Sequence, residues 1–261
     1  MRKNIALLLV CALLMSCISA LAEMEIIVFA AASLTETMNT IAGLYEAENP
    51  DVKITCNFDS SGTLKRQIQE GADCDLFISA AQRQMDQLDI VDPETRVNLL
   101  ENRVILAVPE GNPKGIQTFD QLAELLKDGE ILLAIGNSDV PVGQYTQKIF
   151  DYYGIDEAAI ADKLTYGSNV KEVTTQVSEY SVDCGIIYST DAFSAGLTAV
   201  DEATAEMCGG QVIYPAAVLK TSKHGEAARA FLNYLQTEAA SSVYASVGFI
   251  TIAGAGAERP A

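Results

Sequence analysis

The fold is decided by the stretch EIIVFAAASLTETMNTIAGLYEAE, residues 25–48, which predicts a strand that leads directly into a helix. Its first six residues form a run of mostly apolar, β-branched side chains, typical of a buried strand. From Leu34 onward the apolar residues recur at helical spacing, at Met38, Ile41 and Tyr45. Alanines and Ser33 fill the junction and leave no room for a loop. A strand followed at once by a helix is the repeating unit of layered α/β domains.

The same unit recurs along the chain. Further strands are expected at residues 52–58, 75–79, 104–108, 131–135 and 184–188, and further helices at residues 63–70, 82–88, 119–126, 143–153, 170–180, 225–236 and 238–246. This alternation predicts an α/β fold with mainly parallel sheets and helices on both faces.

The length allows two lobes, because about 230 residues remain beyond the leader and suffice for two modest domains. Two extended segments, residues 103–109 and 211–219, are the expected crossings between the lobes. A cleft between two lobes is a common place for a ligand. The expected division gives lobe 1 residues 23–103 plus 214–252, and lobe 2 residues 104–213.

The two ends of the chain differ from the rest in composition. A basic pair, an apolar run and a small-residue motif follow one another within residues 1–22, which is the order of an export signal. A lipobox-like motif, LMSC, ends at Cys17, so the alternative is a lipoprotein signal at residues 1–16 with Cys17 acylated. Both place the folded part outside the cytoplasm, in the periplasm or, if lipid-anchored, on the outer face of the cell membrane. The Gly/Ala-rich residues 253–261 are expected to be a disordered tail.

The net charge excludes nucleic acid as a partner. The chain has 17 basic and 35 acidic residues and a formal charge of −18, which becomes −20 when the two basic residues of the leader are removed. Such a surface repels a phosphate backbone. It also repels small anions at long range, so an anionic ligand must be held by local dipoles.

Four segments place free backbone N–H groups at the start of a helix: residues 30–34 (AAASL), 59–64 (DSSGTL), 139–143 (DVPVG) and 168–171 (SNVK). The first helical turn leaves four donors unpaired and carries about half a positive charge, so it attracts anions without a basic side chain. Ser33 and Asn169 each precede a glutamate by three positions, so simple N-capping is the alternative. For Ser33 both roles are compatible, because a hydroxyl accepts and donates. The basic residue in these segments is Lys171, whose side chain is expected to lie beyond the Val170 donor.

Six motifs follow one another in order: FAAASL at residues 29–34, FDSSGTL at 58–64, DLFISA at 75–80, VPVG at 140–143, GIIYSTDA at 185–192 and YP at 214–215. Together they resemble the molybdate-binding proteins of ABC importers, and they span nearly all of the chain beyond the leader.

The resemblance implies a type II periplasmic-binding-protein fold with two lobes and a two-strand hinge. It also implies a monomer that passes molybdate or tungstate to the membrane permease of an ABC importer. The family's ligand contacts fall on the side chains of Ser33, Ser61 and Tyr188 and on the backbone N–H groups of Val142 and Val170. Many relatives have alanine at position 142, but a main-chain contact does not depend on the side chain. No cofactor is implied, and no metal cation is bound directly, because the oxyanion carries the metal.

The ligand chemistry leaves several alternatives open. Molybdate near neutral pH is a dianion that offers acceptors only, which matches a site of N–H and O–H donors. Tungstate is too similar in size and charge to be ranked against it. Sulfate remains an alternative, as does phosphate, whose proton needs an acceptor that Asp59 or Asp139 would supply. A ferric ion bound by Tyr152 and Tyr153 is a further alternative, although both tyrosines fall within an amphipathic helix.

No enzyme is expected. The single histidine, His224, lies away from every motif, so a Ser/His/Asp triad has no support. Neither a GxSxG elbow nor a Walker A loop occurs.

Four cysteines lie beyond the leader, at Cys56, Cys74, Cys184 and Cys208. Their wide spacing fits neither a CxxC redox motif nor a zinc ribbon. Either one disulfide forms, as an exported protein permits, or all four are buried small apolar residues. Cys74 replaces the small residue usual in the related proteins, and the sequence offers no reason for it.

Overall fold

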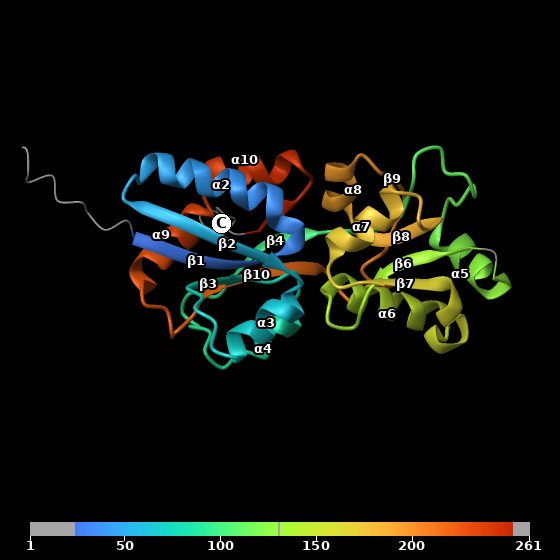
Figure 1. Ribbon diagram of the computed structural model, residues 1–261, viewed down its shortest axis with the longest axis horizontal. Helices are drawn as coiled ribbons and strands as arrows, with labels where there is room; N and C mark the ends of the chain where they lie inside the picture. Colours follow the sequence, from blue (N-terminus) through green and yellow to red (C-terminus); the bar gives the residue numbers. More distant parts are fainter. Residues whose placement is uncertain (1–23, 130, 253–261) are drawn as a thin grey trace, which may run out of the picture.

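The computed structural model describes residues 24–129 and 131–252, which form two lobes, each built on one sheet (Figure 1). The predicted leader, Cys17 and the predicted tail lie outside the described residues. Within the described part, no helix is both long and apolar enough to cross a membrane.

Lobe 1 has a six-stranded sheet made of β1 (Met24–Ala31), β2 (Val52–Asp59), β3 (Leu76–Ile78), β4 (Val97–Asn102), β10 (Val212–Val218) and β11 (Ile250–Thr251). Its helices are the 3-10 turn η1 (Ala32–Leu34), α2 (Thr35–Glu48), α3 (Ser61–Gln69), α4 (Gln82–Asp86), α9 (Gly225–Tyr234) and α10 (Glu238–Ser246). The strand order is β11-β4-β10-β3-β1-β2. Helices α2, α9 and α10 cover one face of this sheet and α3 and α4 the other (Figure 1). The helical stripe of Met38, Ile41 and Tyr45 is buried, as its spacing predicted.

Lobe 2 has a five-stranded sheet made of β5 (Val104–Val108), β6 (Leu133–Gly136), β7 (Leu164–Gly167), β8 (Cys184–Tyr188) and β9 (Thr198–Glu202). Its helices are α5 (Phe119–Asp128), α6 (Pro141–Tyr153), the 3-10 helix η2 (Glu157–Lys163), α7 (Val170–Ser178) and α8 (Ser189–Ala195). The strand order is β7-β6-β8-β5-β9. The two-lobed α/β architecture is therefore the one that the sequence predicted.

The sheets are mixed, whereas the sequence predicted mainly parallel ones. β1 pairs in parallel with β2 and β3, and β6 does so with β7 and β8. However, β10 runs antiparallel to β3 and β4, and β5 runs antiparallel to β8 and β9. The reason is that β5 and β10 enter their lobes from the crossings and not from a preceding helix.

The chain crosses between the sheets twice. β4 ends at Asn102 and β5 begins at Val104, so the first crossing is a single residue, Arg103. The second crossing is residues 203–211, between β9 and β10. β5 and β10, which the sequence placed within the crossings, each belong to one sheet. We propose that the lobes turn about these two connections.

The described cysteines form no disulfide, and all four carry free thiols. Cys74, Cys184 and Cys208 are buried and Cys56 is half-buried. Burial raises the pKa of Cys56 and of Cys74 to about 12, and that of Cys208 to about 11. Since the thiolate is the reactive form, these side chains act as small apolar packing groups.

We therefore expect the protein cut after Ala22 to resist alkylation while it is folded. Cys56, the most accessible of the four, should react slowly, and all four should react fully in guanidinium. Mass spectrometry after alkylation counts the modified thiols. A pair of cysteines that stays unmodified after unfolding, but reacts after reduction, would show a disulfide and contradict the free-thiol state.

Candidate functional site

A small buried pocket lies where the starts of helices from both lobes meet. Its lining residues are Ala31, Ala32, Ser33, Ser60, Ser61 and Ala80 from lobe 1, and Val140, Pro141, Val170 and Tyr188 from lobe 2. The cavity volume is only about 10 Å³, far below the roughly 300–1,000 Å³ typical of sites for drug-sized molecules. The pocket therefore suits a small ion. The lining contains no charged side chain.

Ser33 is held by a relay of hydrogen bonds that starts at the first crossing. Asn102 Nδ2 donates to the Tyr214 hydroxyl (3.1 Å), and the Tyr214 and Ser33 hydroxyls lie 3.0 Å apart. Either hydroxyl can be the donor in this pair, and Tyr214, which accepts from Asn102, can pass its own hydrogen to Ser33 Oγ. In that arrangement Ser33 accepts from Tyr214, and its own hydrogen is available to the pocket.

The simple capping role of Ser33 is wrong. The residue lies within η1, which Ala31 precedes, and no side chain caps that turn. Asn169 behaves differently, because its side chain accepts from the Glu172 N–H (3.1 Å) and caps α7 as predicted. Of the two candidate caps, therefore, only Asn169 is one.

Ser61 is directed at the pocket in the same way as Ser33. It begins α3, its side chain is fully buried, and its Oγ accepts from the Ala80 N–H (2.9 Å). The preceding residue, Ser60, caps the helix by accepting from the Thr63 N–H (3.1 Å). With the cap supplied by Ser60 and its lone pair used by Ala80, Ser61 keeps its hydrogen for a pocket ligand.

The lobe 2 donors come from two helix starts. Pro141 is the first residue of α6 and has no N–H, so Val142 supplies the first donor of that helix. Val142 is fully buried and does not itself line the pocket, whereas Pro141 does. Val170 begins α7 and lines the pocket. The side chain of Asn169 accepts from the Glu172 N–H, so this cap does not occupy the Val170 N–H.

Tyr188 ends β8 and contributes a hydroxyl with an unmet hydrogen-bonding need. Its side chain is 1% exposed, and its hydroxyl has Tyr214 as a neighbour but makes no hydrogen bond of good geometry to any described residue. The ring packs edge-on against Tyr214, with centroids 5.8 Å apart. An unsatisfied buried hydroxyl is costly, so a ligand oxygen in the pocket would satisfy it.

Asp59 and Asp139, the two possible acceptors for the proton of hydrogen phosphate, do not line the pocket. Asp59 accepts from the Ser60 N–H beside it, and Asp139 pairs with Arg66 of α3. The paired tyrosines proposed for iron lie at the far end of α6, where Tyr153 donates to Asp120 (2.8 Å) and Tyr152 is exposed. Over residues 24–129 and 131–252, no group of three His, Cys, Asp or Glu side chains is arranged to hold a metal.

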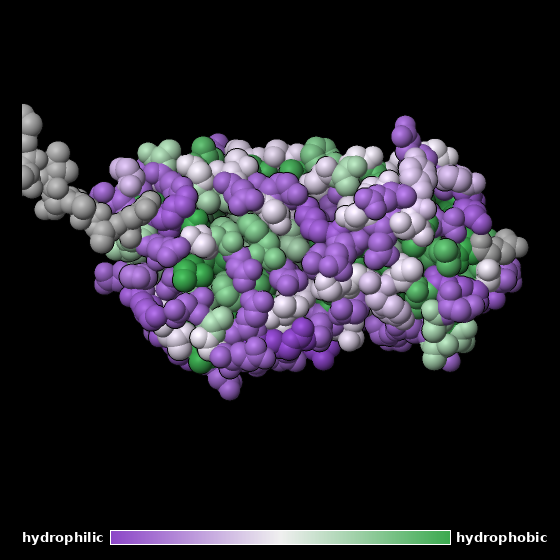
Figure 2. Space-filling model, in the orientation of Figure 1, coloured by the Kyte–Doolittle hydropathy of each residue, from purple (hydrophilic) through white to green (hydrophobic). Residues whose placement is uncertain are grey.

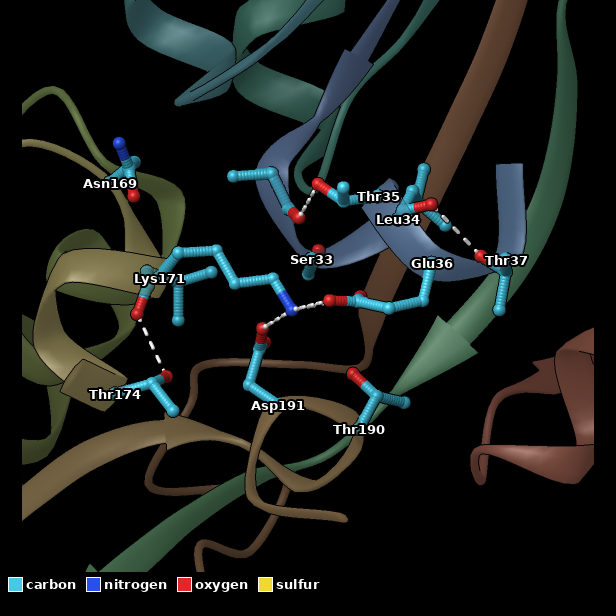
Figure 3. A network of polar contacts seen from close by, with 12 residues as sticks. Ser33, Leu34, Thr35, Glu36, Thr37, Asn169, Lys171, Thr174, Thr190 and Asp191 are labelled. Carbon is cyan, nitrogen blue, oxygen red and sulfur yellow. Dashed lines mark hydrogen bonds and ion pairs between the residues drawn. The ribbon is translucent and has the colours of Figure 1, made fainter. Parts of the chain in front are cut away.

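Lys171 follows Val170 but also does not line the pocket. Its ammonium lies between Glu36 and Asp191 (Figure 3). Burial lowers the pKa of Lys171, but the two carboxylates outweigh this effect and raise it. Burial raises the pKa of Asp191 to about 6, although Lys171 opposes the shift. No local sequence pattern predicts this contact, because Glu36, Lys171 and Asp191 are distant along the chain.

The lobes touch closely around the pocket. Besides the contact of Lys171 with Glu36, Arg66 pairs with Asp139, and Gln84 donates to Gln144 (3.1 Å). Hydrophilic residues also cover the junction on the face shown in Figure 2. The cleft is therefore closed, and the donors of both lobes surround one small space.

Comparison with known proteins agrees with this geometry. Residues 26–250 match the family described as bacterial extracellular solute-binding protein. The molybdate-binding protein ModA of Escherichia coli (strain K12) is 34% identical, covering 87% of this chain and 89% of its own. YvgL of Bacillus subtilis (strain 168), whose name describes a substrate-binding lipoprotein of an ABC transporter, is 33% identical, covering 87% and 86%.

Solved structures share the fold. The periplasmic molybdate-binding protein of Azotobacter vinelandii has a TM-score of 0.74 at 18% identity, covering 87% of this chain and 99% of its own. The sulfate-binding protein SubI of Mycobacterium tuberculosis H37Rv also has a TM-score of 0.74, at 20% identity and with 89% and 88% coverage. At these identities the likeness concerns the fold alone. The family match and the ModA relatives show that the chain belongs to the bacterial extracellular solute-binding proteins, among the ModA-like substrate-binding proteins of ABC transporters.

Proposed function

We propose that this protein captures molybdate, or tungstate, outside the cytoplasm and delivers it as a monomer to the membrane permease of an ABC importer. The observation that carries the proposal is the closed pocket between the lobes, which is lined by uncharged residues and into which the hydroxyls of Ser33, Ser61 and Tyr188 can donate. The ligand contacts would be the hydroxyls of Ser33, Ser61 and Tyr188 and the N–H groups of Val142 and Val170. Export through residues 1–22, or lipid anchoring at Cys17, belongs to the same proposal.

A fully deprotonated dianion fits this site because it accepts hydrogen bonds and donates none. Ser61 Oγ accepts from the Ala80 N–H, and the Tyr188 hydroxyl makes no well-formed hydrogen bond to a described residue, so both hydroxyls can donate to a ligand. A ligand that carries a proton, such as hydrogen phosphate, would bury that proton without an acceptor, since no carboxylate lines the pocket. The lack of a carboxylate acceptor in the pocket disfavours phosphate.

Sulfate is the nearest rival, since it is also a dianion without a proton and SubI shares the fold. The six ordered motifs and the 34% identity to the molybdate-binding protein ModA favour molybdate over sulfate. A role as an enzyme has less support, because none of the three pocket serines has a histidine beside it and His224 is exposed at the start of α9.

Calorimetric titration should rank the four anions. We expect the protein cut after Ala22 to bind molybdate and tungstate far more tightly than sulfate or phosphate, because the pocket supplies donors only and its size is set by the closed lobes. Sulfate binding as tight as molybdate binding would contradict the molybdate assignment and favour a role in sulfate transport.

Removing single hydroxyls should weaken binding without unfolding the protein. A hydrogen bond to a charged group contributes about 1.5–3 kcal/mol, so Ser33→Ala and Ser61→Ala should each raise the Kd for molybdate roughly ten- to a hundredfold. Tyr188→Phe is the more specific test of ligand binding, because the hydroxyl that it removes makes no hydrogen bond of good geometry to the described residues. That variant should lose affinity while keeping or gaining thermal stability.

The matched control for these variants is Ser178→Ala, on the exposed side of α7. Its affinity should equal that of the wild type. Normal molybdate affinity in all three pocket variants would show that the ligand lies elsewhere.

Gly62 sets how closely the lobes approach. A Cβ at this position would lie 2.2 Å from the carbonyl oxygen of Asp139 in the other lobe. Overpacking of this kind costs about 1–3 kcal/mol, so Gly62→Ala should reduce molybdate affinity roughly five- to a hundredfold by resisting closure. Because Gly62 lies in α3, alanine should not lower the stability of the ligand-free protein.

Gly43→Ala in α2 is the control, since nothing lies within 4 Å of its added Cβ. X-ray scattering with and without molybdate reports closure. A Gly62→Ala protein that compacts and binds like the wild type would contradict the closed arrangement described above.

A further inference from the structure

Lys171 connects the two lobes next to the pocket without entering it. Its Nζ lies 2.8 Å from both carboxylate oxygens of Glu36, on α2 of lobe 1. It also lies 3.3 Å from Asp191 Oδ1, on α8 of lobe 2 (Figure 3). We propose that Glu36, Lys171 and Asp191 form a closure clamp, in which Lys171 is a positioning residue that slows release of the bound anion by holding the lobes together.

The two halves of the clamp differ in burial. The Asp191 side chain is fully buried, and its oxygens have no hydrogen-bond partner among the described residues apart from the ion pair with Lys171. Losing that ammonium would leave a buried charge uncompensated, so Lys171 and Asp191 stay together within lobe 2. The Glu36 side chain is 51% exposed and is brought by lobe 1. Glu36 is therefore the partner that leaves when the cleft opens.

The clamp is not an anion-attracting device. Two carboxylates face one ammonium, so the cluster has a formal charge of −1 and offers no electrostatic attraction to a dianion. Its position around the pocket gives it a mechanical role, because breaking the contact with Glu36 is part of opening. We therefore expect an effect on the dissociation rate and little effect on the association rate.

A second ion pair between the lobes, Arg66 with Asp139, is weaker by the same reasoning. Its side chains are 49% and 52% exposed, so water competes for both. Lys171 is only 30% exposed and is held by a buried carboxylate, so less side-chain freedom is lost when it meets Glu36. The ion pair of Lys171 with Glu36 is therefore the stronger of these two contacts between the lobes.

The test is stopped-flow release of molybdate from the protein cut after Ala22, and it rests on the proposed function only for its probe. Glu36→Gln should raise the dissociation rate about three- to tenfold, as expected for one partly exposed ion pair, with the association rate unchanged within about twofold. Lys171→Gln should raise it at least as much. The double variant should release no faster than Lys171→Gln alone, because both changes break the same contact.

The control is Asp73→Asn, which breaks an exposed ion pair with Lys223 inside lobe 1. It should leave both rates unchanged. The melting temperature of ligand-free Glu36→Gln should also stay at the wild-type value, since Glu36 fastens the lobes and not the fold. A merely structural role would lower it.

Three results would overturn the clamp: an unchanged dissociation rate in Glu36→Gln, effects of the two single changes that multiply in the double variant, or a loss confined to the association rate. If the titration finds sulfate to be the tighter ligand, the same rates are measured with sulfate. The clamp and the molybdate assignment are thereby tested separately.

Discussion

The hydrogen bonds among Asn102, Tyr214 and Ser33 hold the pocket serine in place. Tyr214 accepts from Asn102 and can donate to Ser33, which leaves the serine hydrogen available to the proposed ligand. The relay begins at the last residue of β4, immediately before the chain crosses to lobe 2. Asn102 also donates to Thr190 in lobe 2 (3.0 Å), so the proposed hinge and the candidate site share one set of hydrogen bonds.

A site without charged side chains is a physical solution to an acidic exterior. The surface repels anions, and a lysine in the pocket would attract any anion that reached it. Hydroxyl and N–H donors bind only a ligand that satisfies all of them, so selectivity comes from what would be left unpaired. Closure then removes water, which strengthens each hydrogen bond. Gly62 permits the close approach, and the ion pairs around the pocket hold it.

Local sequence patterns predicted much of this structure, because strand-to-helix junctions are short-range features. The start of α7 and the bounds of β8 were predicted from such patterns, and α3 and α6 begin two residues before the predicted starts. Antiparallel pairing of β5 and β10 was not predicted, since the direction of a strand depends on where the chain enters the sheet. Short or exposed elements such as α8 and β9 also carry too little periodicity to be seen. The contact of Lys171 with Glu36 joins residues 135 positions apart, and no local pattern reports it.

Anomalous diffraction at the molybdenum edge, on crystals grown with molybdate, would locate the bound ion. We expect a single peak in the pocket, with ligand oxygens roughly 2.7–3.2 Å from the hydroxyls of Ser33, Ser61 and Tyr188 and from the backbone nitrogens of Val142 and Val170. Lys171 should remain paired with Glu36 and Asp191. A molybdenum peak outside this pocket, or one bound by the Lys171 ammonium, would contradict this assignment.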